Sequence, residues 1–495
     1  MHALLSLVEG ISGLAVFGIY LYLAVVVVFI IMENRDISST LAWILVFLLF
    51  PIIGFVLYVF FGRNWKVVSP NKKEHIKDLQ EKVEHVLFDL RARQKKYLKN
   101  LDKDHVSYGK KRIIRVTEKN IDSLITFQND VKIIQSGKEK FDLLKRDIKN
   151  AKNFIHLEYF IWRKDVLTEE IKTLLIKKAK EGVEIRVLFD PVGTFFTYVF
   201  SPRYFASMKK AGIEVVPFYN KLSPFKITTV NYLLHRKIVI IDGKIGYTGG
   251  MNMGQEYVDG GNEFDSWRDT HLRVCGESVL SLQTTFAVNW EEASGKSIFD
   301  KIYFPTYSNN NCNNLMVQMI VSDPHAYWQT IHQSLFAMAL AARKHVYVQT
   351  PYFIPDVNLF EALKIIALSG IDVKIMVAGI PDKYIVYWAA FTYFEELLNA
   401  GVEIYHYNAG FMHAKTFSVD GKVCSIGTTN MDIRSLHLSY ENNVLIYDDG
   451  TTQKLENDFL EDIKKCKRFT LEDYKKINVF AKLRNSLVRL LSPLL

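Results

Sequence analysis

The chain has 495 residues, a formal net charge of +9 and a sequence pI near 9.0. The net positive charge favours a negatively charged binding partner, but it does not distinguish an anionic lipid from a nucleic acid. No C-x-x-C spacing occurs, so the composition does not support a zinc site, and a cytoplasmic chain would keep its thiols reduced. The four cysteines are Cys275, Cys312, Cys424 and Cys466.

Two apolar stretches open the chain. Residues 10–32 run for 23 positions without a charge, and residues 37–62 run for 26 more. Each stretch is long enough for a transmembrane helix. We therefore predict a two-helix transmembrane hairpin in residues 1–62, with a signal peptide or a buried core helix as the alternative.

The charges beside the two stretches predict an orientation. The short loop between them holds a single basic residue, Arg35, and four basic residues follow the second stretch closely: Arg63, Lys66, Lys72 and Lys73. The positive-inside rule then places the rest of the chain on the cytoplasmic side of a membrane. We expect a multi-pass protein of the cytoplasmic membrane.

Residues 63–111 are expected to form a charged, amphipathic connector. Apolar side chains recur there every three or four positions, which is typical of a helix with one apolar face: Ile76, Leu79, Val83, Val86 and Leu90. A short dimeric coiled coil is the alternative.

The remainder of the chain repeats itself. Residues 155–161 parallel 346–354, residues 182–189 parallel 370–377, and residues 212–216 parallel 401–405, each segment following a helical pattern. Helices alternate with buried strands in both copies, so we predict two homologous α/β domains at about 112–322 and 323–467. A repeat of this size excludes a solenoid.

Each copy contains the pattern H-x-K-x4-D. A random chain of this composition is expected to hold the pattern less than once. His and Lys are two positions apart and share a face of the predicted strand, whereas Asp lies on the opposite face. The six candidate catalytic residues are His235, Lys237, Asp242, His413, Lys415 and Asp420.

Asp-Gly follows the predicted strand in both copies and favours a two-residue β-hairpin. Turn formation is therefore the alternative to a catalytic role for each Asp. Counting back from such a turn places Gly250 opposite His235 and Thr428 opposite His413. The same pairing brings the amides of Asn252 and Asn430 beside the histidines.

These side chains suit a phosphodiester. Lys supplies positive charge and Asn supplies amide donors, so the site needs no metal and no cofactor to hold a phosphate. An imidazole is a nucleophile or a proton donor near neutral pH, and two of them divide these tasks.

The doubled pattern resembles the HKD motifs of the phospholipase D superfamily. The resemblance implies two α/β/α domains packed about a pseudo-twofold axis, with His235 forming a covalent phosphohistidine and His413 acting as general acid and then base. It also implies a downstream carboxylate that orients each His. Glu441 and Asp269 are the candidates, and both are open to reading as ordinary surface charges.

The last residues, 468–495, are expected to form an amphipathic helix. An apolar stripe runs through basic residues there and is suited to an anionic bilayer, with packing on the chain's own domain as the alternative. The stripe consists of Val479, Phe480, Leu483, Leu487, Leu490 and Leu491.

Within the superfamily, three segments together with the apolar N-terminus resemble the bacterial cardiolipin synthases: residues 249–253, 264–269 and 491–495. Gly427-Thr-Thr departs from the serine-containing triplet of many relatives. The resemblance implies phosphatidyl transfer between two phosphatidylglycerol molecules at a membrane, with no nucleic-acid partner. A homo-oligomer stays open.

Three other functions remain as alternatives. A membrane-bound phospholipase D would use water as the acceptor, a nuclease would cleave nucleic acid, and a non-catalytic scaffold would only bind acidic lipids. The scaffold predicts that both histidines are dispensable.

Overall fold

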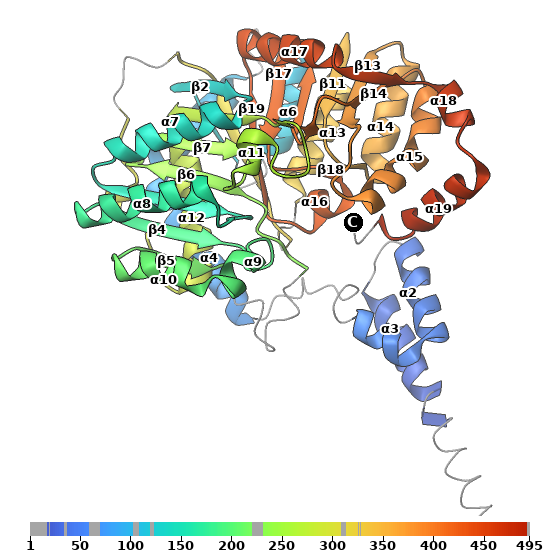
Figure 1. The fold of residues 1–495 in the computed structure, drawn as a ribbon, viewed down its shortest axis with the longest axis horizontal. Helices are drawn as coiled ribbons and strands as arrows, with labels where there is room; N and C mark the ends of the chain where they lie inside the picture. Colours follow the sequence, from blue (N-terminus) through green and yellow to red (C-terminus); the bar gives the residue numbers. More distant parts are fainter. Residues whose placement is uncertain are drawn as a thin grey trace, which may run out of the picture. The chain divides into compact units, whose positions relative to one another are not determined.

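The structure is a computed structural model of residues 1–495, drawn in Figure 1. It describes residues 17, 18, 20–33, 37–58, 70–101, 108–118, 123–219, 231–307, 313–324, 326 and 328–492. The chain divides into two compact units. One comprises residues 1–73 with 223–231, and the other comprises residues 74–222 with 232–495.

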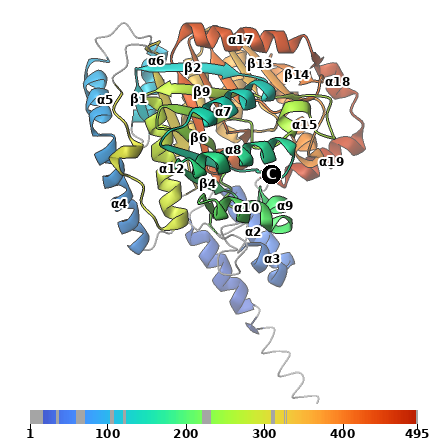
Figure 2. The same cartoon turned by 60° about the vertical axis from the view of Figure 1, so that its left-hand side comes forward.

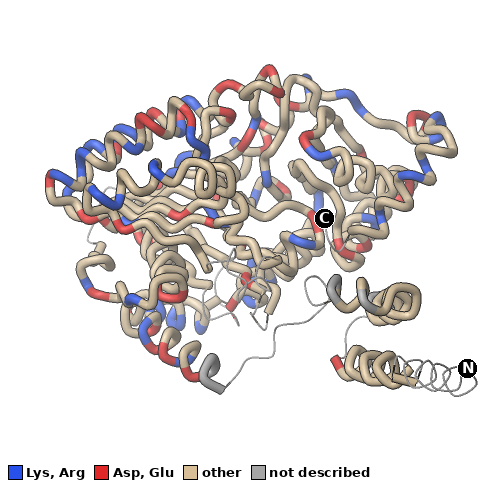
Figure 3. The backbone as a smooth tube through the Cα atoms, turned by 60° about the horizontal axis from the view of Figure 1, so that its bottom comes forward, with Lys and Arg blue, Asp and Glu red and all other residues tan. Residues whose placement is uncertain are grey.

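The described residues of the first unit are mainly helical. Residues 20–32 form a helix, followed by α2 (Ile37–Leu49) and α3 (Pro51–Leu57). Proline has no backbone N–H, so the second apolar stretch breaks at Pro51 instead of running on as one helix. Figure 3 shows how few charged residues these helices carry. Among the described residues, none of the helices has the length and apolar character that a membrane crossing requires.

The helices of the first unit pack against one another. Ile30, Phe47 and Tyr58 form a small buried cluster, and the Tyr58 hydroxyl donates to Glu33 Oε2 at 2.7 Å. This contact joins the two expected apolar stretches as a helical hairpin. Residues 10–16, 19 and 59–62 of those stretches lie outside the described residues.

The connector consists of α4 (Pro70–Val86) and α5 (Phe88–Asn100), and α6 (Tyr108–Glu118) follows. Val83, Leu87 and Leu90 bury their side chains against Leu280 of α12 (Ser278–Ser294). Figure 2 shows α4 and α5 running beside α12. The part of the apolar stripe from Val83 to Leu90 is thus covered from within the chain.

The second unit contains two large sheets. The seven-stranded sheet has the order β2-β9-β7-β6-β3-β4-β5. Its strands are β2 (Asn129–Ile134), β3 (Phe154–Tyr159), β4 (Glu184–Phe189), β5 (Glu214–Pro217), β6 (Lys237–Ile241), β7 (Ile245–Gly249) and β9 (His271–Gly276).

The nine-stranded sheet has the order β1-β10-β19-β17-β16-β11-β13-β14-β20. Its strands are β1 (Leu124–Thr126), β10 (Val317–Ser322), β11 (His345–Gln349), β13 (Asp372–Ala378), β14 (Glu403–Tyr407), β16 (Thr416–Val419), β17 (Val423–Gly427), β19 (Glu441–Ile446) and β20 (Cys466–Phe469).

The two sheets share one topology. Without the edge strands β1 and β20, the second sheet repeats the strand order of the first, and three parallel strands, β11, β13 and β14, correspond to β3, β4 and β5. Gly182, Gly212, Gly370 and Gly401 all adopt positive φ where a helix ends before one of these strands. This regularity matches the repeat seen in the sequence.

Helices cover both faces of each sheet, giving α/β/α layers (Figure 1). The first sheet has α7 (Gly137–Asn150), α8 (Val166–Lys180) and α10 (Pro202–Lys210) on one face and α12 on the other. The second has α13 (Thr330–Ala341), α14 (Val357–Leu368) and α15 (Tyr384–Asn399) on one face and α17 (Asp449–Ile463) on the other.

Short elements complete the fold. Two-stranded ladders join β8 (Trp267–Arg268) to β15 (Phe411–Met412) and β12 (Phe353–Ile354) to β18 (Met431–Asp432). The short helices are α9 (Phe195–Phe200), α11 (Glu256–Asp259), α16 (Ile433–His437) and a 3₁₀ turn at Lys301–Tyr303.

The last segment holds two helices, α18 (Leu471–Lys475) and α19 (Val479–Arg489), instead of one. Arg484 lies over the ring of Trp388 at 4.1 Å, and Arg489 lies over Tyr393 at 4.7 Å, so α19 packs along α15 through its basic side chains. Its apolar stripe points outward: Val479, Phe480, Leu483, Leu487, Leu490 and Leu491 are all exposed.

Candidate active site

The two motif histidines lie where the two halves of the second unit meet. The backbone N–H of His235 donates to the carbonyl of Tyr440 at 3.0 Å, and that of His413 donates to the carbonyl of Arg268 at 2.7 Å. Each acceptor belongs to the opposite half of the chain. The start of each motif is therefore fixed by backbone contacts across the interface.

A carboxylate from the opposite half holds each imidazole. Glu441 Oε1 lies 2.9 Å from His235 Nδ1, and Asp269 Oδ2 lies 2.8 Å from His413 Nδ1. Each carboxylate directly follows the residue whose carbonyl binds the backbone of the same His. Engagement of Nδ1 leaves Nε2 as the ring atom available for chemistry. Both expected orienting residues are thus at the histidines.

The motif lysines are buried beside their own histidines. Lys237 Nζ donates to the His235 carbonyl at 2.7 Å, and Lys415 Nζ donates to the His413 carbonyl at 2.5 Å. Burial lowers the pKa of Lys237 to about 7 and that of Lys415 to about 8. Both ammonium groups are therefore poised to respond to an anion that enters the site.

The surroundings of the two histidines differ. Burial lowers the pKa of both rings, and that of His413 falls to about 4. Positive charge opposes a proton on both rings: Lys237, Lys415 and Lys383 act in this way on His235, and Lys415 acts in this way on His413. At His413 the charges of Asp269 and Asp382 act in the opposite sense. Burial therefore favours the neutral form of both imidazoles.

The two carboxylates also differ. Burial raises the pKa of Glu441 to about 7, although Lys237 and the Thr428 hydroxyl, which donates to Glu441 Oε2, oppose the rise. Burial acts in the same sense on Asp269, but Lys415 and His413 outweigh it and lower the pKa of Asp269. Asp269 is the more firmly ionised partner.

The two asparagines are buried but have different contacts. Asn252 Nδ2 donates to the Tyr257 hydroxyl at 2.7 Å, and its Oδ1 accepts from the Ile161 N–H at 3.2 Å. Through these bonds, Asn252 positions the loop that follows β7. Asn430 Nδ2 donates to Ser435 Oγ at 3.4 Å, and its Oδ1 is buried with no hydrogen-bond partner among the described residues.

The motif aspartates lie at the far ends of their strands and not at the histidines. Asp242 accepts backbone N–H groups of residues 152–154 at 2.7–3.0 Å, and Asp420 accepts those of residues 343–345 at 2.8–2.9 Å. Both have positive φ. Their geometry gives them a structural role at the starts of β3 and β11, not the catalytic role expected from the motif.

The hairpins are one residue longer than expected. Ile241 pairs with Ile245 and Val419 pairs with Val423, so three residues connect the strands in each copy. The extrapolated partners of the histidines shift by one position, and the predicted pairs with Gly250 and Thr428 are wrong. An Asp-Gly pair specifies positive φ at two positions but does not specify the length of the loop.

Sequence reasoning missed two further acidic residues near the site. Asp190 Oδ2 accepts the Leu234 N–H at 2.8 Å, beside His235, and Asp382 Oδ2 accepts the Tyr352 hydroxyl at 2.6 Å. The Tyr352 ring lies 6.4 Å from that of His413. Both aspartates follow equivalent parallel strands, β4 and β13. Ligands tend to bind at the carboxyl ends of parallel strands, and this tendency could have pointed to both aspartates from the sequence.

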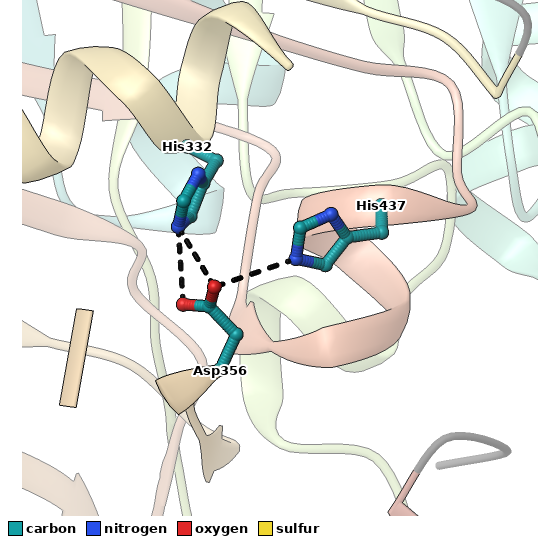
Figure 4. Close-up of side chains that lie close together, drawn as sticks. All are labelled: His332, Asp356 and His437. Carbon is teal, nitrogen blue, oxygen red and sulfur yellow. Dashed lines mark hydrogen bonds and ion pairs between the residues drawn. The ribbon is translucent and has the colours of Figure 1, made fainter. Parts of the chain in front are cut away.

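Among the residues that the structure describes, two clusters have side chains with metal-ligand spacing, and neither includes His235 or His413. In the first, His332 Nε2 lies 3.0 Å from Asp356 Oδ2, and His437 Nε2 lies 3.7 Å from the same oxygen (Figure 4). Asp356 also caps α14 through the Leu359 N–H. This cluster ties the helices α13, α14 and α16 together.

In the second cluster, the ammonium group of a lysine already lies between the carboxylates. The cluster consists of His75, Asp78 and Glu291, and Lys82 Nζ lies 2.7 Å from a carboxylate oxygen of both Asp78 and Glu291. The contacts of this cluster therefore fasten α4 to α12.

The chain is similar to known proteins in sequence and in fold. A family profile described as cardiolipin synthase, PLD-like domain, matches residues 144–287 and 335–463, and one described as phospholipase D-nuclease N-terminal matches residues 18–63. The phosphatidylserine synthase of Haemophilus influenzae superposes with a TM-score of 0.58 at 16% identity, covering 77% of this chain and 98% of its own. That likeness supports the fold alone.

Two curated relatives cover nearly the whole chain. The major cardiolipin synthase of Bacillus subtilis is 38% identical over 97% of this chain and 98% of its own. A cardiolipin synthase of Listeria monocytogenes is 40% identical over 96% of this chain and 97% of its own.

The paired α/β domains and the doubled histidine site define a member of the phospholipase D superfamily. Within that superfamily, the chain belongs to the cardiolipin synthase family. The resemblance expected from the sequence is confirmed.

Proposed function

We propose that the chain transfers a phosphatidyl group from one phosphatidylglycerol to another, giving cardiolipin and glycerol. The observation that carries the proposal is the crossed pair of His–carboxylate contacts, His235 with Glu441 and His413 with Asp269, beside two buried lysines. Membership of the cardiolipin synthase family supports the choice of substrate.

In the first step, His235 Nε2 attacks the phosphorus of the donor lipid. A nitrogen–phosphorus bond forms, the bond to the glycerol oxygen breaks, and His413 gives its proton to the departing glycerol. The phosphodiester brings a negative charge beside His413, which raises its pKa from about 4 and favours the protonated ring. Lys237 and Lys415 stabilise the charge that develops on the phosphoryl oxygens.

In the second step, neutral His413 removes the proton from a glycerol hydroxyl of the acceptor lipid. That oxygen attacks the phosphohistidine, the nitrogen–phosphorus bond breaks, and cardiolipin leaves with His235 restored. Water in place of the lipid hydroxyl would give phosphatidic acid, so the acceptor decides between transfer and hydrolysis.

The proposal includes the arrangement of the chain. Residues 1–62 would form the membrane hairpin, residues 63–111 the connector, 112–322 and 323–467 the two catalytic domains on the cytoplasmic side, and 468–495 the amphipathic end. Support comes from the N-terminal family match and from exposed apolar side chains in α2.

A labelled lipid with a good leaving group tests the proposal. With a p-nitrophenyl ester of phosphatidic acid, departure needs no acid, so the variant His413→Ala should accumulate label on the protein, and His235→Ala should not. Label retained in His235→Ala but absent from His413→Ala would reverse the two roles. On phosphatidylglycerol vesicles, the unchanged protein should form cardiolipin. Phosphatidic acid without cardiolipin would contradict the transfer reaction.

A further inference from the structure

A six-residue helix presents aromatic side chains to solvent. In α9, Phe196 is 66% exposed and Phe200 is 69% exposed, with Phe195 and Val199 also exposed. The rings of Phe196 and Phe200 stack on each other with centroids 6.1 Å apart. An exposed apolar cluster of this kind is typical of a surface that binds a membrane or another protein.

This helix begins at the edge of the candidate active site. Gly193 packs so closely against Phe160 that a Cβ there would lie 2.7 Å from ring atoms, and the Phe160 ring lies 4.9 Å from that of His235. Asp190, three residues earlier, binds the backbone next to His235. The segment between β4 and α9 thus leads directly from His235 to the exposed rings.

The second half has an equivalent apolar segment. At the start of α15, Tyr384 is 60% exposed and Ile385 is 45% exposed, and the preceding Ile380 is exposed as well. Asp382 lies within this segment and binds Tyr352 beside His413. α9 follows β4 and α15 follows β13, so the two apolar segments occupy corresponding places in the repeat.

We infer that these segments are two lipid-binding lips of the active site, each taking the acyl side of one lipid from the bilayer. The α9 lip comprises Phe195, Phe196, Val199 and Phe200, and the α15 lip comprises Ile380, Tyr384 and Ile385. This inference rests on the proposed function, because a reaction between two lipids needs two apolar approaches to one phosphate site.

The surrounding charge fits an anionic lipid surface. Lys383 lies between Ile380 and Tyr384, and exposed Arg203 follows α9 closely. The helix α19, which packs along α15, also has an exposed apolar stripe. Aromatic side chains flanked by basic ones are typical of segments that enter the headgroup region of a bilayer.

The two lips have different tasks. The α9 lip adjoins His235 and holds the donor, whose phosphorus His235 attacks. The α15 lip adjoins His413 and holds the acceptor, whose hydroxyl His413 deprotonates. When the acceptor lipid is poorly held, water attacks the phosphohistidine more often, and the nitrogen–phosphorus bond breaks to give phosphatidic acid.

Two double variants of the full chain test this division, Phe196→Ser with Phe200→Ser and Tyr384→Ser with Ile385→Ser. On long-chain phosphatidylglycerol vesicles, the first should lose roughly tenfold in turnover with an unchanged product ratio. The second should raise the ratio of phosphatidic acid to cardiolipin severalfold. With short-chain, monomeric phosphatidylglycerol, both should stay within about twofold of the unchanged protein.

Val166→Ser and Leu368→Ser are matched controls, because both residues are exposed apolar side chains on other helices. An equal loss on vesicles and on monomeric lipid would overturn the inference, since it would mean a damaged site. Full turnover of both double variants on vesicles would overturn it too, as would an unchanged product ratio in the α15 variant.

A binding measurement separates the inference from the proposed function. Phe196→Trp and Tyr384→Trp should each gain fluorescence that brominated lipids in phosphatidylglycerol vesicles quench, whereas Val166→Trp should not. Quenching without any cardiolipin formation would support lipid binding by the two lips and contradict the synthase reaction. Cardiolipin formation without quenching at either position would sustain the reaction and overturn the lips.

Discussion

Glu441 Oε1 lies 2.9 Å from His235 Nδ1, although the two residues are 206 positions apart in the chain. The opposite crossing joins Asp269 to His413 at 2.8 Å. Neither half of the repeat therefore contains both a motif histidine and the carboxylate that orients it. The domains must pack correctly before either imidazole is oriented, which makes activity a property of the interface.

Replacing Glu441 by Gln should lower kcat on phosphatidylglycerol vesicles by roughly 10²-fold or more. An amide still fills the space, but it no longer stabilises the ring charge or fixes the tautomer of His235. Thermal unfolding should shift little, because Gln keeps the size of the side chain. Glu456→Gln, a change of the same kind on α17, serves as the control and should retain activity.

The pH profile of kcat/KM should be bell-shaped with its maximum near neutral pH. The pKa of Glu441 is raised to about 7, so the carboxylate that orients His235 is lost as the pH falls below that value. The pKa of Lys237 is lowered to about 7, so its positive charge is lost as the pH rises above it. The two limbs belong to the coupled site and not to either residue alone.

Lys237→Arg separates the two limbs. Arg keeps its charge throughout the accessible range, so the alkaline limb should move toward the value of about 8 that belongs to Lys415, while the acidic limb stays in place. A profile from pH 5.5 to 9 on phosphatidylglycerol vesicles measures both. An alkaline limb that does not move would show that Lys237 does not control it.

Asp242→Ala should lower stability far more than it lowers the activity of the folded protein. The change removes an acceptor of three backbone N–H groups and leaves a non-glycine residue at φ 53° without a local hydrogen bond. A loss of about 2–4 kcal/mol in unfolding free energy is expected. Asp242→Asn should lose less, since Asn tolerates positive φ. Normal stability with abolished turnover would restore the catalytic reading.

The motif predicted the reacting side chains because spacing within a strand fixes which residues share a face. His235, Lys237, His413 and Lys415 were found in this way, although β6 begins at Lys237 and β16 at Thr416, so both histidines and Lys415 precede the strands in which they were expected. The carboxylates were harder to choose, because a partner from the other half leaves no spacing signal. Asp269 was the weaker candidate from the sequence, yet its contact with His413 is as short as that of Glu441 with His235.

Other features depended on packing that no local pattern reveals. The side-chain amide of Asn252 donates to the hydroxyl of Tyr257, a residue five positions further along the chain that belongs to no motif. Asp190 and Asp382 follow strands in loops without a motif, so the repeat that relates β4 to β13 did not single them out. Hairpin length was misjudged because turn residues specify dihedral angles more strongly than register.

Chelation should leave phosphatidyl transfer within about twofold of its starting rate. Lys237 and Lys415 are buried beside the histidines and supply the positive charge that a metal ion would otherwise bring to the phosphate. Turnover on phosphatidylglycerol vesicles is measured before and after dialysis against EDTA. His332→Gln, which alters the cluster on α13, should lower the melting temperature without changing the response to EDTA, because His332 contacts Asp356 and not the site. A loss of activity on dialysis that added Zn²⁺ restores in the unchanged protein, but not in His332→Gln, would contradict this and make that cluster a functional metal site.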